Sequence, residues 1–136
     1  MLIDSNILIY SVNNSSPKQV PAQKFLKENS ERLEFSHQNI LEAVRVLTHA
    51  KFPNPMNPTE AADAILKIVE SGRIVNPNMR TLFIVLELIK KYSLAGNRIF
   101  DAYLAATLLS NGIDTIATDN IRDFQKFPLK VIDPFS

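Results

Sequence analysis

Short runs of apolar residues alternate with longer amphipathic segments along the whole chain. The short runs are rich in Leu, Ile and Val and are bounded by polar residues, Gly or Pro, as β-strands in a protein core usually are. The pattern predicts five strands, at residues 1–4, 32–36, 72–77, 114–119 and 130–134.

The longer segments repeat their apolar residues with the period of an α-helix. We expect helices at residues 21–31, 37–50, 57–72, 78–94 and 98–112. Ser36 and Asn97 stand where N-caps are found. The clearest start is at Asn57, because Pro58 follows at the first helical position and Glu60 completes a capping-box pattern.

Short apolar strands that alternate with helices predict an α/β fold, a three-layer α/β/α sandwich with a mainly parallel central sheet. The 136 residues suffice for one sizeable core and not for two, so we expect a single domain over residues 1–136. The proline-rich segment 51–58 is a stiff connection between helices, and we do not expect a domain boundary there. In open sheets of this class, ligands bind at the carboxyl ends of the strands.

Composition excludes several kinds of chemistry. The chain has no Cys, which excludes disulfides, thiolate zinc sites, iron–sulfur clusters and cysteine nucleophiles. Asp4 interrupts the apolar start of the chain and no stretch approaches about 18 apolar residues, so we expect a cytoplasmic protein without a membrane span. The formal net charge of +1 neither requires nor excludes a nucleic-acid partner.

Two carboxylates directly follow predicted strands. Asp4 ends the first strand and Asp119 ends the fourth, which places both at the edge where ligands bind in this class of fold. The alternative is structural, because an Asp in this position also serves as the N-cap of the next helix. The sequence leaves both interpretations open.

Asp101 lies on the same helical face as Leu104, Ala105 and Leu108, which form an apolar stripe. A carboxylate on such a face needs a cation, hydrogen bonds or a position where the stripe opens into a pocket. The structural alternative is an ion pair with Arg98 one helical turn earlier.

Glu42 gives a weaker signal. It lies at the polar edge of its helix with Arg45 three residues later, which on its own indicates a surface ion pair.

Four acidic residues from four segments, Asp4, Glu42, Asp101 and Asp119, nevertheless favour a metal site. Hard oxygen ligands suit Mg²⁺ or Mn²⁺. The two histidines lie far apart without a partner at i+4, which disfavours zinc. With three glycines, the chain also lacks the glycine-rich loops that bind nucleotide phosphates and the G-x-S-x-G turn of serine hydrolases.

The order of four motifs, "LIDSN", "NILEAVRVL", "FDAYLAATLL" and "IATDNIRDF", resembles the PIN domain ribonucleases over nearly the whole chain, and specifically the short VapC-type toxins of toxin–antitoxin pairs. The resemblance implies that Asp4, Glu42 and Asp101 take the three acidic positions of the family, with Ser5 and Asn6 as supporting residues. A fourth position falls within 118–124, where Thr118, Asp119, Asn120 and Asp123 are available. We favour Asp119 as the catalytic and metal-binding residue, because it is nearest the strand end.

The resemblance further implies an endoribonuclease that depends on Mg²⁺ or Mn²⁺ and hydrolyses RNA phosphodiester bonds. Single-stranded or loop RNA is the expected substrate, and Arg45, Lys51, Arg98 and Arg122 are candidates for contacts with its backbone. Expected protein partners are a cognate antitoxin and a second copy of the chain. We assign the binding surface to the apolar residues Phe25, Leu26, Phe52 and Met56.

Two other classes of function compete with this interpretation. One is a non-catalytic PIN-like protein or RNA-binding module, in which the acids only stabilise the fold; the presence of all three main carboxylates argues against it. The other is a receiver or phosphatase domain, which would need paired acids around the first strand end, where Asp4-Ser5-Asn6 supplies one.

Overall fold

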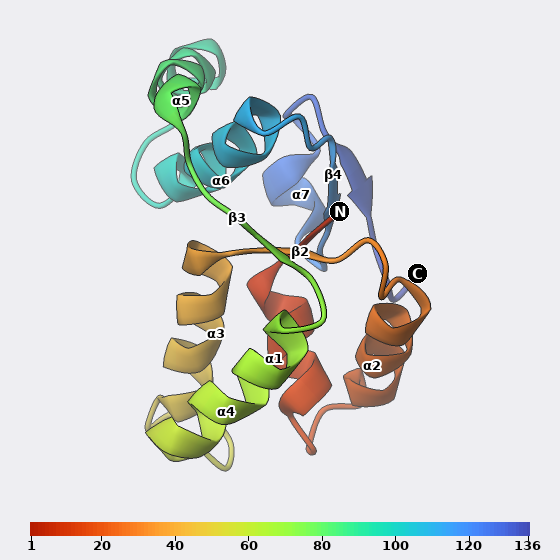
Figure 1. The fold of residues 1–136 in the computed structure, drawn as a ribbon. Helices are drawn as coiled ribbons and strands as arrows, with labels where there is room; N and C mark the ends of the chain where they lie inside the picture. Colours follow the sequence, from red (N-terminus) through yellow and green to blue (C-terminus); the bar gives the residue numbers. More distant parts are fainter.

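The computed structural model describes all residues, 1–136, and places a central sheet between two layers of helices (Figure 1). The strands are β1 (Leu2–Ile3), β2 (Glu34–Ser36), β3 (Arg73–Val75), β4 (Thr115–Ala117) and β5 (Lys130–Ile132). The helices are α1 (Ser5–Val12), α2 (Gln19–Glu28), α3 (His37–Thr48), α4 (Pro58–Val69), α5 (Met79–Tyr92), α6 (Arg98–Ser110) and α7 (Ile121–Phe124). The predicted three-layer α/β fold is confirmed.

The five strands are all parallel and lie in the order β3-β2-β1-β4-β5. Leu2 of β1 is in register with Glu34 of β2 on one side and with Ile116 of β4 on the other. After β1 the chain builds the sheet outward through β2 and β3, and then returns to the other side of β1 with β4. The order therefore reverses between β1 and β4, and in such sheets ligands bind at the carboxyl ends of the strands at this point.

Consecutive residues of the central strands point into different cores. Ile3 and Ala117 belong to the core beneath α1, α2, α3 and α4, whereas Leu2 and Ile116 belong to the core beneath α5, α6 and α7. Both faces of the sheet are therefore buried against helices, which explains why its strands have continuous apolar sequences.

The predicted helix starts are only partly correct. The Ser36 hydroxyl accepts a hydrogen bond from Asn39 N and Asn57 Oδ1 accepts one from Glu60 N, as N-caps should. The reciprocal bond that would complete a capping box at Glu60 is absent, since its side chain makes no hydrogen bond to the Asn57 backbone. Asn97 stands at the N-cap position of α6 as predicted, but its backbone is helical and its side chain makes no capping hydrogen bond.

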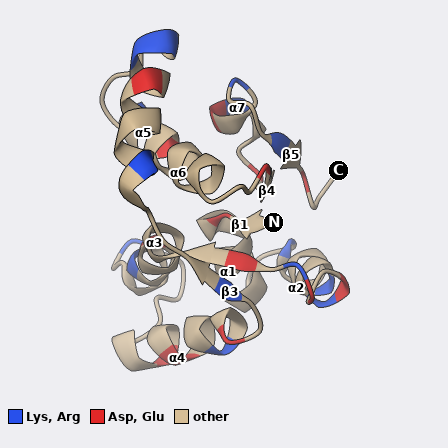
Figure 2. Cartoon of the chain, turned by 45° about the horizontal axis from the view of Figure 1, so that its top comes forward, with Lys and Arg blue, Asp and Glu red and all other residues tan.

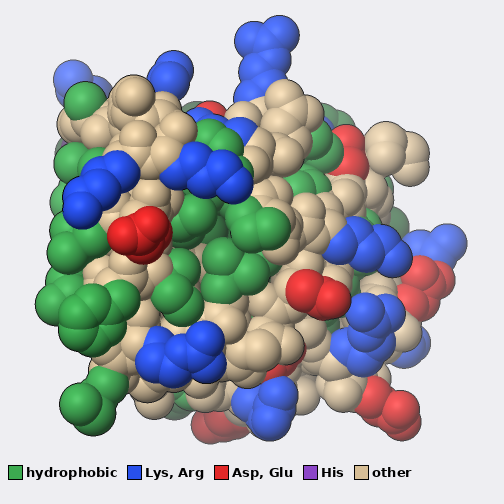
Figure 3. Space-filling model, turned by 90° about the horizontal axis from the view of Figure 1, so that it is seen from above, with side chains coloured by type: hydrophobic (Ala, Val, Ile, Leu, Met, Phe, Trp, Pro, Cys, Tyr) green, Lys and Arg blue, Asp and Glu red, His purple; other side chains and the backbone are tan.

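The residues predicted to form an apolar binding surface are buried or only partly accessible. Leu26 is buried, and Phe25, Phe52 and Met56 pack partly against the core below the sheet. Exposed apolar side chains instead gather on the outer face of the molecule, where α5 carries Met79, Leu82, Phe83 and Leu86. Figure 3 shows the surface from this side, with hydrophobic side chains surrounded by Lys and Arg. None of the helices combines the length and hydrophobicity needed to cross a lipid bilayer.

Candidate active site

Asp4 lies at the carboxyl end of β1, beside the end of β4, and is buried. Its Oδ2 accepts a hydrogen bond of 2.6 Å from the hydroxyl of Thr118, and its Oδ1 accepts one of 2.8 Å from Ser5 N. The bond from Ser5 N is also the N-cap of α1. The two interpretations of Asp4 are therefore compatible, because the same carboxylate caps a helix and lies at the edge where ligands bind.

A third donor to Asp4 comes from Asn39, which the sequence did not single out. Asn39 Nδ2 donates to Asp4 Oδ1 at 3.0 Å, and Asn39 Oδ1 accepts a bond of 2.6 Å from the Ser36 hydroxyl. The Asn39 side chain is only 1% exposed, so both bonds are shielded from water. The sequence does contain a signal for the role of Asn39, because this polar residue lies on the inward face of α3 together with the apolar residues Ala43 and Leu47.

Burial is the dominant influence on the Asp4 carboxyl and raises its pKa. The hydrogen bonds from Thr118 and Ser5 act in the opposite direction, and the negative charge of Glu42 raises the pKa further. Asp4 and Glu42 therefore lie near enough for their negative charges to repel each other, although Asp4 follows β1 and Glu42 lies on α3.

Glu42 on α3 and Asp101 on α6 line a cleft of about 620 Å³ between these two helices. Gln38 Nε2 donates to the backbone oxygen of Phe100 at 3.4 Å and connects the two walls. Neither predicted ion pair forms: the four ion pairs of the structure are Met1–Glu34, Lys18–Asp119, Lys24–Glu28 and Arg73–Glu34. Asp101 and Glu42 thus keep their carboxylates available at the cleft.

The pKa of Asp101 is raised from 3.8 to about 6. Partial burial is the largest cause, followed by the negative charges of Asp123, Asp4 and Glu42, while Lys126 acts in the opposite direction. Four carboxylates therefore share one electrostatic environment around Asp101. Asp123 reaches this environment because the short helix α7 follows β4 directly.

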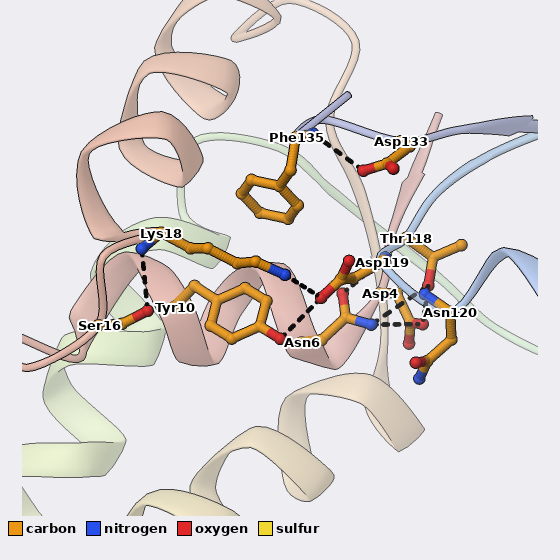
Figure 4. Close-up of polar contacts among 10 residues, drawn as sticks. All are labelled: Asp4, Asn6, Tyr10, Ser16, Lys18, Thr118, Asp119, Asn120, Asp133 and Phe135. Atoms are coloured by element: carbon orange, nitrogen blue, oxygen red, sulfur yellow. Dashed lines mark hydrogen bonds and ion pairs between the residues drawn. The ribbon is translucent and has the colours of Figure 1, made fainter.

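Asp119 lies outside this group of charges. Its Oδ2 accepts a hydrogen bond of 2.8 Å from the Tyr10 hydroxyl and forms an ion pair of 2.7 Å with Lys18 (Figure 4). The hydrogen bond from Lys18 is the main reason that the pKa of Asp119 is lowered. The Lys18 ammonium in turn lies 5.0 Å from the ring centre of Tyr10 and 4.9 Å from that of Phe135.

The remaining supporting residues connect β4 to α1. Asn6 Nδ2 donates to the Thr118 hydroxyl at 3.2 Å, and Asn6 Oδ1 accepts from Asp119 N at 3.3 Å. Asn120 N donates to the same Thr118 hydroxyl at 3.0 Å. Asn6, Thr118 and Asn120 therefore hold the end of β4 against Asp4, as Figure 4 shows.

The four basic residues predicted to contact RNA do not form one patch. Arg45 lines the cleft beside Glu42, whereas Lys51, Arg98 and Arg122 are exposed and do not line it. Figure 2 shows Lys and Arg distributed over helices and strands on both sides of the sheet.

The donor chemistry of the site suits a hard cation. Asp4, Glu42, Asp101 and Asp123 offer only carboxylate oxygens. Their mutual repulsion adds to burial in raising the pKa of Asp101, and a positive charge would relieve it. No three of these carboxylates converge into a preformed ligand set. The fit therefore rests on ligand type and charge.

Comparison with known proteins agrees with the fold. The sequence profile of the PIN domain matches residues 1–129, so the chain belongs to the PIN domain family. Ribonuclease VapC24 of Mycobacterium tuberculosis is 31% identical over 139 residues, covering 98% of this chain and 96% of that protein. Ribonuclease VapC37 of the same organism is 29% identical over 135 residues, covering 93% and 90%. Among solved structures, a chain of a toxin–antitoxin complex from Klebsiella pneumoniae superposes with a TM-score of 0.70 at 19% identity, covering 99% of this chain and 98% of that one.

Proposed function

We propose that the protein is an endoribonuclease that uses Mg²⁺ or Mn²⁺ and acts as the toxin of a VapBC-type toxin–antitoxin pair. The observation that carries the proposal is the cluster of carboxylates around Asp101, which share one electrostatic environment at the carboxyl edge of a PIN-domain sheet. The ribonuclease names of two relatives that match along most of this chain support the same activity.

Each residue has a defined task in this proposal. Asp4 and Asp101 would hold the cation, and Glu42 would complete the site from α3. Thr118 and Asn39 orient the Asp4 carboxylate through the bonds described above. When bound, the cation would supply the positive charge that activates water and stabilises the developing charge on the phosphate.

We propose Asp123 as the fourth acid, in place of the Asp119 that the sequence favoured. Asp123 is the strongest negative neighbour of Asp101, whereas the Asp119 carboxylate is bound by Lys18 and Tyr10. A calorimetric titration with Mg²⁺ distinguishes the two residues. Asp123→Asn should weaken Mg²⁺ binding and reduce the accompanying proton release, while Asp119→Asn should change neither. The reverse result would restore Asp119 to the site.

An antitoxin partner is supported by the structural likeness to a chain of a toxin–antitoxin complex. We propose that it binds the groove of about 410 Å³ between α2 and α4, which contains Leu26, Leu33 and Ile68. Lys27 and Lys67 also line this groove and no acid does, so the bound segment should be apolar with acidic flanks.

We also propose a homodimer formed through the exposed apolar face of α5. Met79 is 89% exposed and Phe83 is 70% exposed, which is costly for a monomer in water. Phe83→Glu should therefore lower the mass measured by light scattering from that of a dimer to that of a monomer, and an unchanged mass would exclude this face.

The activity is tested by incubating the purified protein with a panel of structured RNAs in Mg²⁺ or in EDTA. Cleavage in Mg²⁺ that stops in EDTA supports the proposal, and cleavage that continues undiminished in excess EDTA contradicts it. RNA binding without cleavage in either condition would favour the non-catalytic RNA-binding module.

A further inference from the structure

The cleft between α3 and α6 has an apolar part directly beside the carboxylates. Leu41 precedes Glu42 on α3 and is 67% exposed, and Phe100 precedes Asp101 on α6 and is 60% exposed. Both line the cleft, one from each wall. An aromatic ring left in water next to catalytic acids has no role in the core, because the core beneath α6 is formed by residues such as Ala102 and Ala105.

Polar groups of the same cleft are available to a ligand. The side chain of Asn97 makes no capping hydrogen bond, and Asn97 is one of the residues that line the cleft. Arg45 lines it as well and forms no ion pair. An amide can both donate to and accept from the edge of a nucleic-acid base, and a guanidinium binds phosphate. The cleft thus combines a flat apolar surface, an amide and a cation within reach of the acids.

We propose that this cleft binds one unpaired ribonucleotide next to the phosphate that is cleaved, and that Phe100 determines the preference for unpaired RNA. The base stacks on the Phe100 ring against Leu41, the Asn97 amide hydrogen-bonds the base edge, and Arg45 contacts the adjoining phosphate. This inference rests on the proposed ribonuclease activity. The volume of about 620 Å³ lies within the usual range for ligand sites of about 300–1,000 Å³.

The composition of the cleft favours a nucleotide over a segment of protein. An apolar peptide would leave Asn97 and Arg45 without partners, whereas a nucleotide offers a base edge to the amide and a phosphate to the guanidinium. A base paired in a duplex cannot offer its face to Phe100, because neighbouring bases cover it. The site therefore selects loops and single strands through stacking.

The test is a binding measurement by fluorescence anisotropy in EDTA, where no cleavage takes place. The probes are a labelled oligouridylate and a ribose-phosphate oligomer of the same length without bases. The variants are Phe100→Ala, the conservative Phe100→Trp, and the control Leu66→Ala, whose exposed side chain lies on α4 and does not line the cleft. Phe100→Ala should weaken oligouridylate binding about 5- to 100-fold and leave the baseless oligomer unaffected, because stacking requires a base. Phe100→Trp should retain the affinity, and Leu66→Ala should change the binding of neither probe.

The outcomes separate this inference from the proposed function. Equal binding of both probes by the wild type, or an unchanged affinity in Phe100→Ala, overturns the role of Phe100 while RNA cleavage in Mg²⁺ still stands. A loss with Phe100→Ala that is accompanied by a change in mass on light scattering overturns it in favour of a protein–protein contact at this ring. Failure of the wild type both to bind the oligouridylate and to cleave RNA refutes the proposed function itself.

Discussion

Asp101→Asn should stabilise the protein in the absence of metal, and only above the pH at which Asp101 ionises. The raised pKa means that the folded state holds this proton more tightly than the unfolded chain does. Ionisation therefore costs no stability below about pH 4, an increasing amount between about pH 4 and 6, and a constant amount above that range. The Asn side chain removes this cost because it cannot ionise.

The size of the effect follows from the shift. The difference between 3.8 and about 6 corresponds to about 3 kcal/mol. Because Asp101 is partly exposed, solvent screening reduces this to about 1–2 kcal/mol. For a chain of this length, the melting temperature in EDTA at pH 8 should rise by about 3–8 °C.

Asp119→Asn is the matched control, since it replaces an acid whose pKa is shifted the other way. Its ion pair with Lys18 contributes stability above the ordinary pKa of an Asp, and this contribution is lost as the pH falls through the lowered pKa. At pH 8, Asp119→Asn should lower the free energy of unfolding by less than about 1 kcal/mol, because both partners are partly exposed, and should lower the melting temperature accordingly.

The assay is a series of thermal melts followed by circular dichroism from pH 3 to about pH 8, in EDTA, for the wild type and both variants. The two variants should diverge in opposite directions from the wild type as the pH rises. A lower melting temperature for Asp101→Asn at pH 8, or a gain that is the same at all pH values, would refute the inference that burial and the neighbouring carboxylates together destabilise the ionised form of Asp101.

Three further results are expected. Asn39→Leu should cost about 1–3 kcal/mol in urea unfolding and reduce cleavage at least about tenfold, because Asp4 loses a buried donor; unchanged cleavage would show that this bond does not orient Asp4. Gly72→Ala should destabilise the fold by about 1–3 kcal/mol, since a Cβ there would lie 2.5 Å from a backbone oxygen and 2.6 Å from an aromatic carbon at β2; a wild-type urea midpoint would contradict it. Mg²⁺ in about 100-fold excess over its Kd should stabilise the wild type by about 2.7 kcal/mol, and a similar gain in Asp4→Asn would remove Asp4 from the metal site.

Local patterns in the sequence were sufficient for much of the fold. Apolar runs identified the five strands, and Ser36 and Asn57 marked helix starts because an N-cap depends on residues only a few positions away. Asn97 takes the N-cap position without making the capping hydrogen bond, because its backbone is helical and not extended, which a residue type alone does not reveal.

The site was less predictable because its contacts join distant segments. Asp4 could be located from the strand that precedes it, but its donor Asn39 lies 35 positions away. Likewise, Asp119 was favoured for its closeness to the strand end, but its carboxylate forms an ion pair with Lys18, which lies 101 positions earlier in the sequence. The sequence contains both partners of each contact, but their proximity follows only from the strand order β1-β4 and the loop before α2.

The most direct test of the carboxylate site compares RNA cleavage by Asp4→Asn and Asp119→Asn in Mg²⁺, after circular dichroism has shown that both variants are folded. Asp4→Asn removes a proposed ligand charge and should reduce the cleavage rate at least about 100-fold. Asp119→Asn removes a carboxylate already bound by Lys18 and should keep cleavage close to the wild-type rate. Full activity in a folded Asp4→Asn would contradict the proposed site.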